Sequence, residues 1–177
     1  MPQAARQVAS QVLSLNGERV ILPNTAVAEI IPYIKPEALS DAIGKSAPDW
    51  LLGMIAWRGI SIPLISIETI FGGHYEQQSK RSSIAIINAV GDAAGVPFFA
   101  IVTQGIPRLL QVSGDTLSAI DETGENNKAV ACHVVLDGDV AVIPDMDEVE
   151  TMLKNVFTVS SEKKKSETKK KSSKKKK

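Results

Sequence analysis

Two apolar runs that meet at a single Arg-Gly pair constrain this chain more than any other feature of its sequence. The stretch is Trp50-Leu-Leu-Gly-Met-Ile-Ala-Trp-Arg-Gly-Ile-Ser-Ile-Pro-Leu-Ile-Ser-Ile67. After the pair, apolar residues alternate with small residues at a period of two, which is typical of a half-buried β-strand. Gly59 supplies the backbone freedom that a tight turn requires. The stretch therefore predicts a β-hairpin with Arg58 and Gly59 at its tip.

The charge of Arg58 limits where this tip can lie. A guanidinium is costly to hold away from water unless it is paired, so Arg58 has to face solvent, a carboxylate or a partner. No catalytic constellation accompanies it in the sequence. The tip is therefore interpreted as a docking surface, with pairing of Arg58 to a neighbouring carboxylate as the alternative.

Hairpin and strand signals recur along the rest of the chain. Asn16-Gly17 and Asp137-Gly138-Asp139 each separate two apolar stretches and predict two further hairpins. About nine strands are expected, in the ranges 8–15, 18–22, 29–34, 50–57, 60–67, 82–90, 96–102, 130–136 and 140–143, and residues 106–112 are expected to continue in extended form. A short helical turn is expected at 24–27, a helical segment at 68–71, and an irregular loop at 35–49. Such spacing favours small barrels or a sandwich over a parallel α/β sheet.

One longer helix is predicted near the end of the folded part. Asp145 can accept a hydrogen bond at the helix N-terminus while Glu148 reaches back, as in a capping box. Apolar residues then recur at three- and four-residue steps: Met146, Val149, Met152, Leu153, Val156 and Phe157. This stripe predicts an amphipathic helix that packs on the body of the protein.

The charge of the chain is segregated, although its formal net value is zero. Residues 158–177 hold ten lysines against two glutamates, a net charge of +8, and residues 1–157 hold ten Lys and Arg against eighteen Asp and Glu, a net charge of −8. We expect a flexible N-terminus over 1–7, a folded domain over 8–157, and a disordered Lys-rich tail over 158–177. The tail suits electrostatic contact with an anionic surface and carries no specific nucleic-acid readout. A solubilising tail, or one that neutralises the acidic body, is the alternative.

The remaining motifs favour no catalytic, metal or cofactor site. Cys132 is the only cysteine and adjoins His133, but neighbours on a strand point to opposite faces. Gly44-Lys45-Ser46 lacks the earlier glycine of a phosphate-binding loop. We see neither a secretory signal nor an apolar run of the roughly 18–20 residues that span a bilayer. The sequence therefore predicts a cytoplasmic protein that is not an enzyme and needs no metal or cofactor.

The hairpin resembles the signature of CheW-like coupling proteins. Gly53-Met-Ile-Ala-Trp-Arg-Gly-Ile-Ser-Ile-Pro-Leu-Ile65 corresponds to Gly-x-x-Asn-Leu-Arg-Gly-x-x-x-Pro-x-x in that family. The first predicted hairpin, with Val20-Ile-Leu-Pro23 and then Val27-Ala-Glu-Ile-Ile31, is similar to the start of the family's domain. Ala47-Pro-Asp-Trp-Leu51 is similar to the element before the signature, and the last hairpin and helix are similar to the family's ending. The resemblance covers about residues 8–157.

This resemblance implies a mainly β fold of two intertwined SH3-like β-barrels with a C-terminal amphipathic helix. It also implies a non-catalytic adaptor that couples the tips of methyl-accepting chemoreceptors to a CheA-type histidine kinase, recruited from the cytoplasm to membrane-associated receptor arrays. The partner-binding residues that it implies are Val27, Glu29, Ile30, Gly53, Trp57, Arg58 and Gly59.

Three departures from the family pattern indicate a divergent branch, such as the adaptors of pilus-linked twitching-motility systems. Ala56-Trp57 stands in place of Asn-Leu, Ser66-Ile67-Glu68 in place of Asp-Leu-Arg, and Gln104 in place of an aspartate. The alternative function is that of a small β-barrel that binds anionic polymers, nucleic acid or a membrane surface, through its Lys-rich tail.

Overall fold

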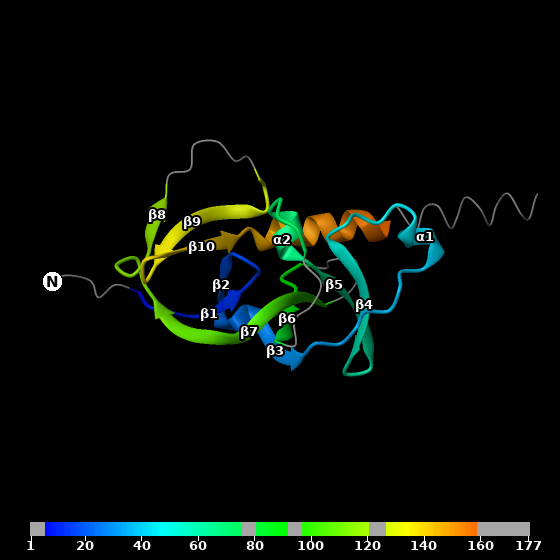
Figure 1. Cartoon of the computed structure of the whole chain (residues 1–177), viewed down its shortest axis with the longest axis horizontal. Helices are drawn as coiled ribbons and strands as arrows, with labels where there is room; N and C mark the ends of the chain where they lie inside the picture. Colours follow the sequence, from blue (N-terminus) through cyan, green and yellow to red (C-terminus); the bar gives the residue numbers. More distant parts are fainter. Residues whose placement is uncertain (1–5, 76–80, 92–96, 121–126, 159–177) are drawn as a thin grey trace, which may run out of the picture.

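The computed structural model describes residues 6–75, 81–91, 97–120 and 127–158 of the chain. Within those residues ten strands form one continuous, curved sheet (Figure 1). The strands are β1 (Val8–Ser14), β2 (Arg19–Pro23), β3 (Val27–Pro32), β4 (Leu51–Trp57), β5 (Ile60–Ile65), β6 (Ser82–Asn88), β7 (Phe98–Val112), β8 (Ser118–Ile120), β9 (Val130–Leu136) and β10 (Asp139–Pro144). The helical elements are a 3₁₀ turn η1 (Asn24–Ala26), α1 (Asp41–Gly44), α2 (Ile67–Ile70) and a C-terminal helix over 146–158. The predicted mainly β fold with a C-terminal helix is confirmed.

The long strand β7 is shared by two barrels. Its first half pairs with β6 and with β5, and these strands together with β3 and β4 form what we call the second barrel. Its second half pairs with β1, and β1, β2, β10, β9 and β8 complete the first barrel. Gly105 lies between the halves with a φ of +66°, a left-handed conformation that favours glycine. The chain therefore turns from one barrel into the other without ending the strand.

Three apolar clusters fill the barrels and the space between them. One lies inside the second barrel and a smaller one inside the first. The largest lies between the barrels, and the C-terminal helix contributes Val149 and Leu153 to it. Alternate side chains of a strand point to opposite faces, so β7 serves two clusters: Phe99 enters the shared one and Ala100 enters the second barrel.

The C-terminal helix begins with only half of the predicted capping box. The Oδ1 of Asp145 accepts the backbone N–H of Glu148 at 3.0 Å, as expected. The backbone N–H of Asp145, however, donates to the carbonyl of Ala129 at 2.8 Å, a bond that we had assigned to the Glu148 side chain. The segment before β9 therefore supplies the second partner of this cap. Along this helix as far as Thr158, the predicted apolar stripe faces the shared cluster.

The structure corrects several other local predictions. The ranges 96–102 and 106–112 belong to one strand, because Gly105 bends β7 without ending it. The predicted irregular loop 35–49 contains α1 and a β-bridge between Glu37 and Met54. β8 was not predicted, because its three residues are too few to show a periodic pattern and are largely exposed. The Lys-rich tail beyond Thr158 lies outside the described residues. Within the described ranges, no helix has the length and apolarity required to cross a bilayer.

Gly53 lies where the segment after β3 runs against β4. The backbone of Glu37 exchanges two hydrogen bonds with Met54, at 2.8 and 3.0 Å. A Cβ on Gly53 would lie 2.4 Å from the carbonyl oxygen of Glu37 and 2.8 Å from the Cβ of Pro36. The φ of Gly53 is +145°, which L side chains rarely adopt. The first glycine of the hairpin signature is thus required by close backbone packing.

We therefore expect Gly53→Ala to lower the free energy of unfolding by about 2 kcal/mol or more, because steric overlap and backbone strain add. Urea denaturation of the full chain measures the effect. The matched control is Gly114→Ala, where an added Cβ meets nothing within 4 Å and φ is not positive; it should change stability by less than about 0.5 kcal/mol. Equal stability of the two variants would contradict this account of Gly53.

A buried carboxylate of the C-terminal helix binds the chain just after β6. The side chain of Glu150, which is 5% exposed, accepts the backbone N–H of Val90 at 2.6 Å through one oxygen and that of Gly91 at 2.8 Å through the other. Hydrogen bonds to an ionised carboxylate are stronger than those between neutral groups. Glu150 thereby holds the end of the second barrel to the helix.

Replacing Glu150 by Gln should lower the free energy of unfolding by about 1–3 kcal/mol, because an NH₂ group would then face a backbone N–H and leave it unpaired. Chemical denaturation measures this loss. Asp147→Asn is the control, since Asp147 is an exposed acidic residue of the same helix. A Glu150→Gln variant as stable as Asp147→Asn would show that these two hydrogen bonds contribute nothing net.

Candidate functional site

The β4–β5 hairpin carries Arg58 at a two-residue turn, as the sequence predicted. Trp57 pairs with Ile60 across the hairpin, so that only Arg58 and Gly59 form the turn. Their φ angles are +47° and +80°. Positive values at both central residues are typical of the type I′ turn, whose twist matches that of the flanking strands. The turn fixes the direction in which the Arg58 backbone leaves the barrel.

Glu29 of β3 receives two hydrogen bonds from this hairpin. Its Oε2 accepts the indole Nε1–H of Trp57 at 2.9 Å and an Nη2–H of Arg58 at 3.0 Å. The pairing register of β3 with β6 shifts between Val27 and Glu29, which marks an irregularity where this strand approaches the hairpin. We call these three side chains the Glu29–Trp57–Arg58 cluster. Arg58 therefore pairs with a neighbouring carboxylate, and its role in docking stays a prediction.

Trp57 is the centre of this cluster. Its side chain is 8% exposed and packs in the apolar interior of the second barrel. The ring meets Phe98 of β7 edge to face, with 4.8 Å between centroids and an interplanar angle of 64°. The guanidinium carbon of Arg58 lies 4.8 Å from the centroid of the same indole, a cation–π distance. One aromatic ring thus joins the barrel interior to an exposed charge.

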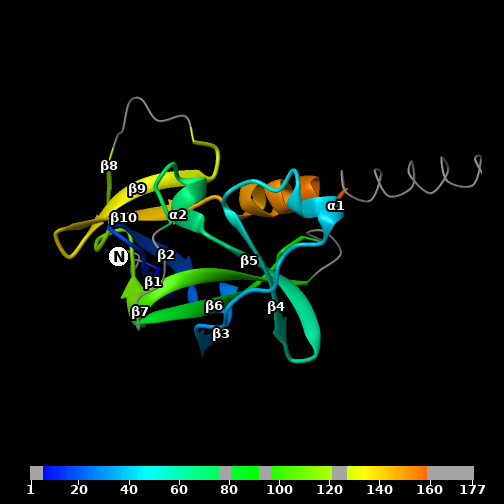
Figure 2. The ribbon, with the colours of Figure 1, turned by 45° about the vertical axis from the view of Figure 1, so that its right-hand side comes forward.

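The cluster also closes the second barrel. In the order of strands, β3 pairs with β6 on one side and β4 pairs with β5 on the other, and no backbone pairing joins β3 to β4 in the part of the chain that the structure describes. Figures 1 and 2 show β3 and the β4–β5 hairpin reaching the same lower end of the molecule. The hydrogen bonds from Trp57 and Arg58 to Glu29 join the two end strands there. In the first barrel, too, an ion pair joins two strands.

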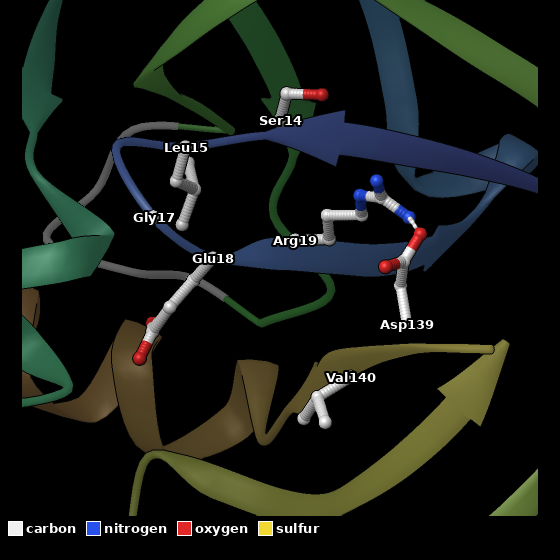
Figure 3. A pocket seen from close by; sticks show the side chains of 7 residues that line it. All are labelled: Ser14, Leu15, Gly17, Glu18, Arg19, Asp139 and Val140. Carbon is white, nitrogen blue, oxygen red and sulfur yellow. Dashed lines mark hydrogen bonds and ion pairs between the residues drawn. The ribbon is translucent and has the colours of Figure 1, made fainter.

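Figure 3 shows a polar recess between the β1–β2 and β9–β10 hairpins. It has a volume of about 380 Å³, and Arg19 and Asp139 form an ion pair across it. β2 and β10 pair at a single register position, Val20 with Val142. Glu18 points away from the ion pair, toward the C-terminal helix. The recess offers no nucleophile beside a base, and its charges join the two strands of a short seam.

The predicted partner-binding residues lie in different surroundings. The structure brings Glu29, Trp57 and Arg58 together, with Gly59 in the same turn. Val27 and Ile30 are half-buried and pack against the shared cluster between the barrels. Gly53 is buried near the opposite end of β4. The role of all seven residues in partner binding stays a prediction.

Sequence analysis missed two exposed apolar side chains on β7. Ile106 is 88% exposed and Leu109 is 61% exposed, just after the bend at Gly105. A partner that covered these two side chains would remove apolar surface from water. Their signal in the sequence was the run Ile-Pro-Arg-Leu-Leu, which does not alternate. We had interpreted this run only as extended chain.

Glu68, one of the three departures from the family pattern, has a structural role. Its side chain is buried, and its Oε1 accepts the backbone N–H of Asn16 at 2.5 Å. It thereby holds the turn between β1 and β2 against α2. The acidic group at position 68 is thus explained by packing inside the protein. Among the described residues, no group of three or more His, Cys, Asp and Glu side chains is arranged to hold a metal ion.

Two barrels that share the strand β7 and a common apolar core, covered by a C-terminal helix, define the class of this domain. A profile of the CheW-like domain matches residues 11–152, which is most of the chain. The chain therefore belongs to the CheW-like domain family. This family is non-catalytic and comprises scaffolding adaptors of chemosensory signalling, so the prediction that the chain is not an enzyme is confirmed.

Among solved structures, the chain is similar to the scaffolding protein TtCheW from Thermoanaerobacter tengcongensis. The TM-score is 0.64 at 18% sequence identity, and the alignment covers 79% of this chain and 90% of TtCheW. This likeness confirms the CheW-like fold. No curated protein matches the chain.

A double-mutant cycle on Glu29→Ala and Arg58→Ala should give a coupling free energy of about 0.5 kcal/mol or less, because both side chains are partly exposed. The coupling should fall further in high salt. A second cycle, on Glu29→Ala and Trp57→Phe, should give about 1 kcal/mol, because the indole N–H belongs to a buried residue. Urea denaturation of the single and double variants measures both values. A larger coupling for Arg58 than for Trp57 would contradict this ranking.

Proposed function

We propose that this chain couples chemoreceptor tips to a CheA-type histidine kinase, with the surface around Arg58 as one of its partner-binding surfaces. The observation that carries the proposal is the state of Arg58. Its side chain is 69% exposed although Glu29 and Trp57 both hold it. An arginine beside buried aromatic groups is the composition of an interface hot spot. A charge that only closed the barrel would not need this exposure.

The exposed side chains of Ile106 and Leu109 offer a second place at which a partner could bind. They lie on the strand that links the two barrels, and an interface that covered them would remove apolar surface from water. An adaptor has to bind two proteins at once, and a second exposed feature away from the hairpin suits that task. Which surface binds the receptor and which binds the kinase is assigned by the experiment below.

The finer functional predictions rest on sequence features. The departures at Trp57 and Gln104 favour a divergent system, such as one linked to pili and twitching motility. The folded domain is proposed to span 8–157 and to act in the cytoplasm, at membrane-associated receptor arrays. The second candidate function is favoured by the ten lysines of residues 158–177: a barrel that contacts anionic polymers or an anionic membrane surface through its tail.

Arg58→Glu should abolish binding to the receptor tip, the kinase regulatory domain, or both, with at least about a hundred-fold loss of affinity, since the substitution reverses the charge at the proposed contact. Titration calorimetry against purified receptor tips and kinase domain from the same genome measures this. The matched control is Arg6→Glu, which makes the same charge change at another exposed arginine. Normal binding by a folded Arg58→Glu variant to both partners would refute the proposal.

A truncation after Thr158, tested in the same titrations, separates the two candidate functions. For the adaptor it should leave receptor and kinase affinity unchanged. For the tail-binding candidate it should abolish affinity for anionic polymer, and that affinity in the full chain should fall steeply with salt.

A further inference from the structure

Trp57 does two things for Arg58 that the family's usual leucine cannot do. Its indole N–H donates to the Glu29 oxygen that also accepts from Arg58, at 2.9 and 3.0 Å. Its ring face lies under the guanidinium, with 4.8 Å from the guanidinium carbon to the ring centroid. A leucine has neither a donor nor a π face. The substitution therefore adds two contacts that act on one exposed charge.

Trp57 is itself held firmly. It is 8% exposed, packs edge to face on Phe98, and stands directly before a turn whose two residues have fixed positive φ angles. A free arginine side chain carries about 2 kcal/mol of rotamer entropy. A stacked and tethered guanidinium has already lost much of this freedom before a partner arrives, and binding then costs less.

Most of the hydrogen-bonding capacity of Arg58 remains available. A guanidinium has five N–H donors in a planar fork. In the part of the chain that the structure describes, Arg58 donates one hydrogen bond, to Glu29. The remaining donors suit a carboxylate, which a guanidinium can bind with two parallel hydrogen bonds. The guanidinium carbon lies over the ring of Trp57, so the side of the group away from the ring is left for the partner.

We infer that Trp57 is a positioning residue that preorganises Arg58 for a carboxylate of the partner, an Asp or Glu side chain on the partner's surface. This inference rests on the proposed docking function of Arg58 and adds the partner's chemistry and the source of the affinity. Glu29 acts with Trp57 as a tether of the guanidinium. The opposite role, in which Glu29 competes with the partner's carboxylate for Arg58, predicts that loosening the cluster raises affinity.

The test measures partner affinity of the full chain for Trp57→Leu, Trp57→Phe and Arg58→Lys, against the receptor tips and kinase domain that bind the wild type. Trp57→Leu should weaken binding about three- to ten-fold, the loss of an exposed cation–π contact and its tether. Trp57→Phe keeps a ring under Arg58 and should recover part of that loss. Arg58→Lys should lose at least as much as Trp57→Leu, because an ammonium lacks the planar fork.

Two further measurements separate positioning from loss of stability. Ile62→Ala removes a fully buried side chain of the same apolar cluster without touching Arg58, so it should lower stability and leave affinity unchanged. The ¹⁵Nε resonance of Arg58 should show slower side-chain motion in the wild type than in Trp57→Leu. If Trp57→Leu fails to fold, the comparison of Trp57→Phe with the wild type decides the same question.

The outcomes distinguish this inference from the function on which it rests. Loss of binding in Arg58→Glu together with wild-type affinity in a folded Trp57→Leu variant overturns the inference and leaves the docking function intact. Tighter binding by Trp57→Leu or Trp57→Phe overturns it in favour of competition by Glu29. Undiminished binding by Arg58→Glu refutes the docking function itself, and the inference with it.

Discussion

The fold depends on one strand that belongs to two barrels. β7 places alternate side chains in the interior of the second barrel and in the cluster between the barrels, and beyond Gly105 it continues as a wall of the first barrel. Neither barrel is complete without it. Because the largest apolar cluster lies between the barrels and is covered by the C-terminal helix, both barrels and the helix are stabilised by the same buried surface.

Each barrel has a weak seam, and each seam carries an arginine paired with a carboxylate. In the second barrel the end strands β3 and β4 are joined by Glu29 with Trp57 and Arg58. In the first barrel β2 and β10 share one register pair, next to the ion pair of Arg19 and Asp139. Exposed ion pairs contribute little stability. The two seams are therefore the places where side chains can exchange partners at small cost to the fold, and the more exposed of the two arginines is the one at the candidate docking surface.

The sequence predicted the hairpins and the helix because their signals are local. The hairpin turns form at short motifs whose backbone preferences do not depend on distant contacts: Asn16-Gly17, Arg58-Gly59 and Asp137-Gly138-Asp139. The site was predicted in part: the resemblance named Glu29, Trp57 and Arg58, but their meeting depends on β3 and β4 closing a barrel, which spacing along the chain does not encode. Contacts that join distant segments were missed for the same reason, as with Glu150 on Val90 and Ala129 on Asp145. Exposure of Ile106 and Leu109 also follows from the bend of β7, and composition gives no sign of it.

The order of the strands sets an order of assembly on the ribosome. The strands of the second barrel all lie between Val27 and Gln104, so they are available as soon as that part of the chain has emerged. The first barrel takes β1 and β2 from the beginning of the chain and β10 from near its end, and Val20 cannot meet Val142 until both have been synthesised. Contacts between residues so far apart in sequence form slowly. The nascent protein therefore passes through a stage in which the barrel that carries Arg58 has its full set of strands while the first barrel is open. At that stage the apolar surface shared by the barrels is not yet covered by the C-terminal helix.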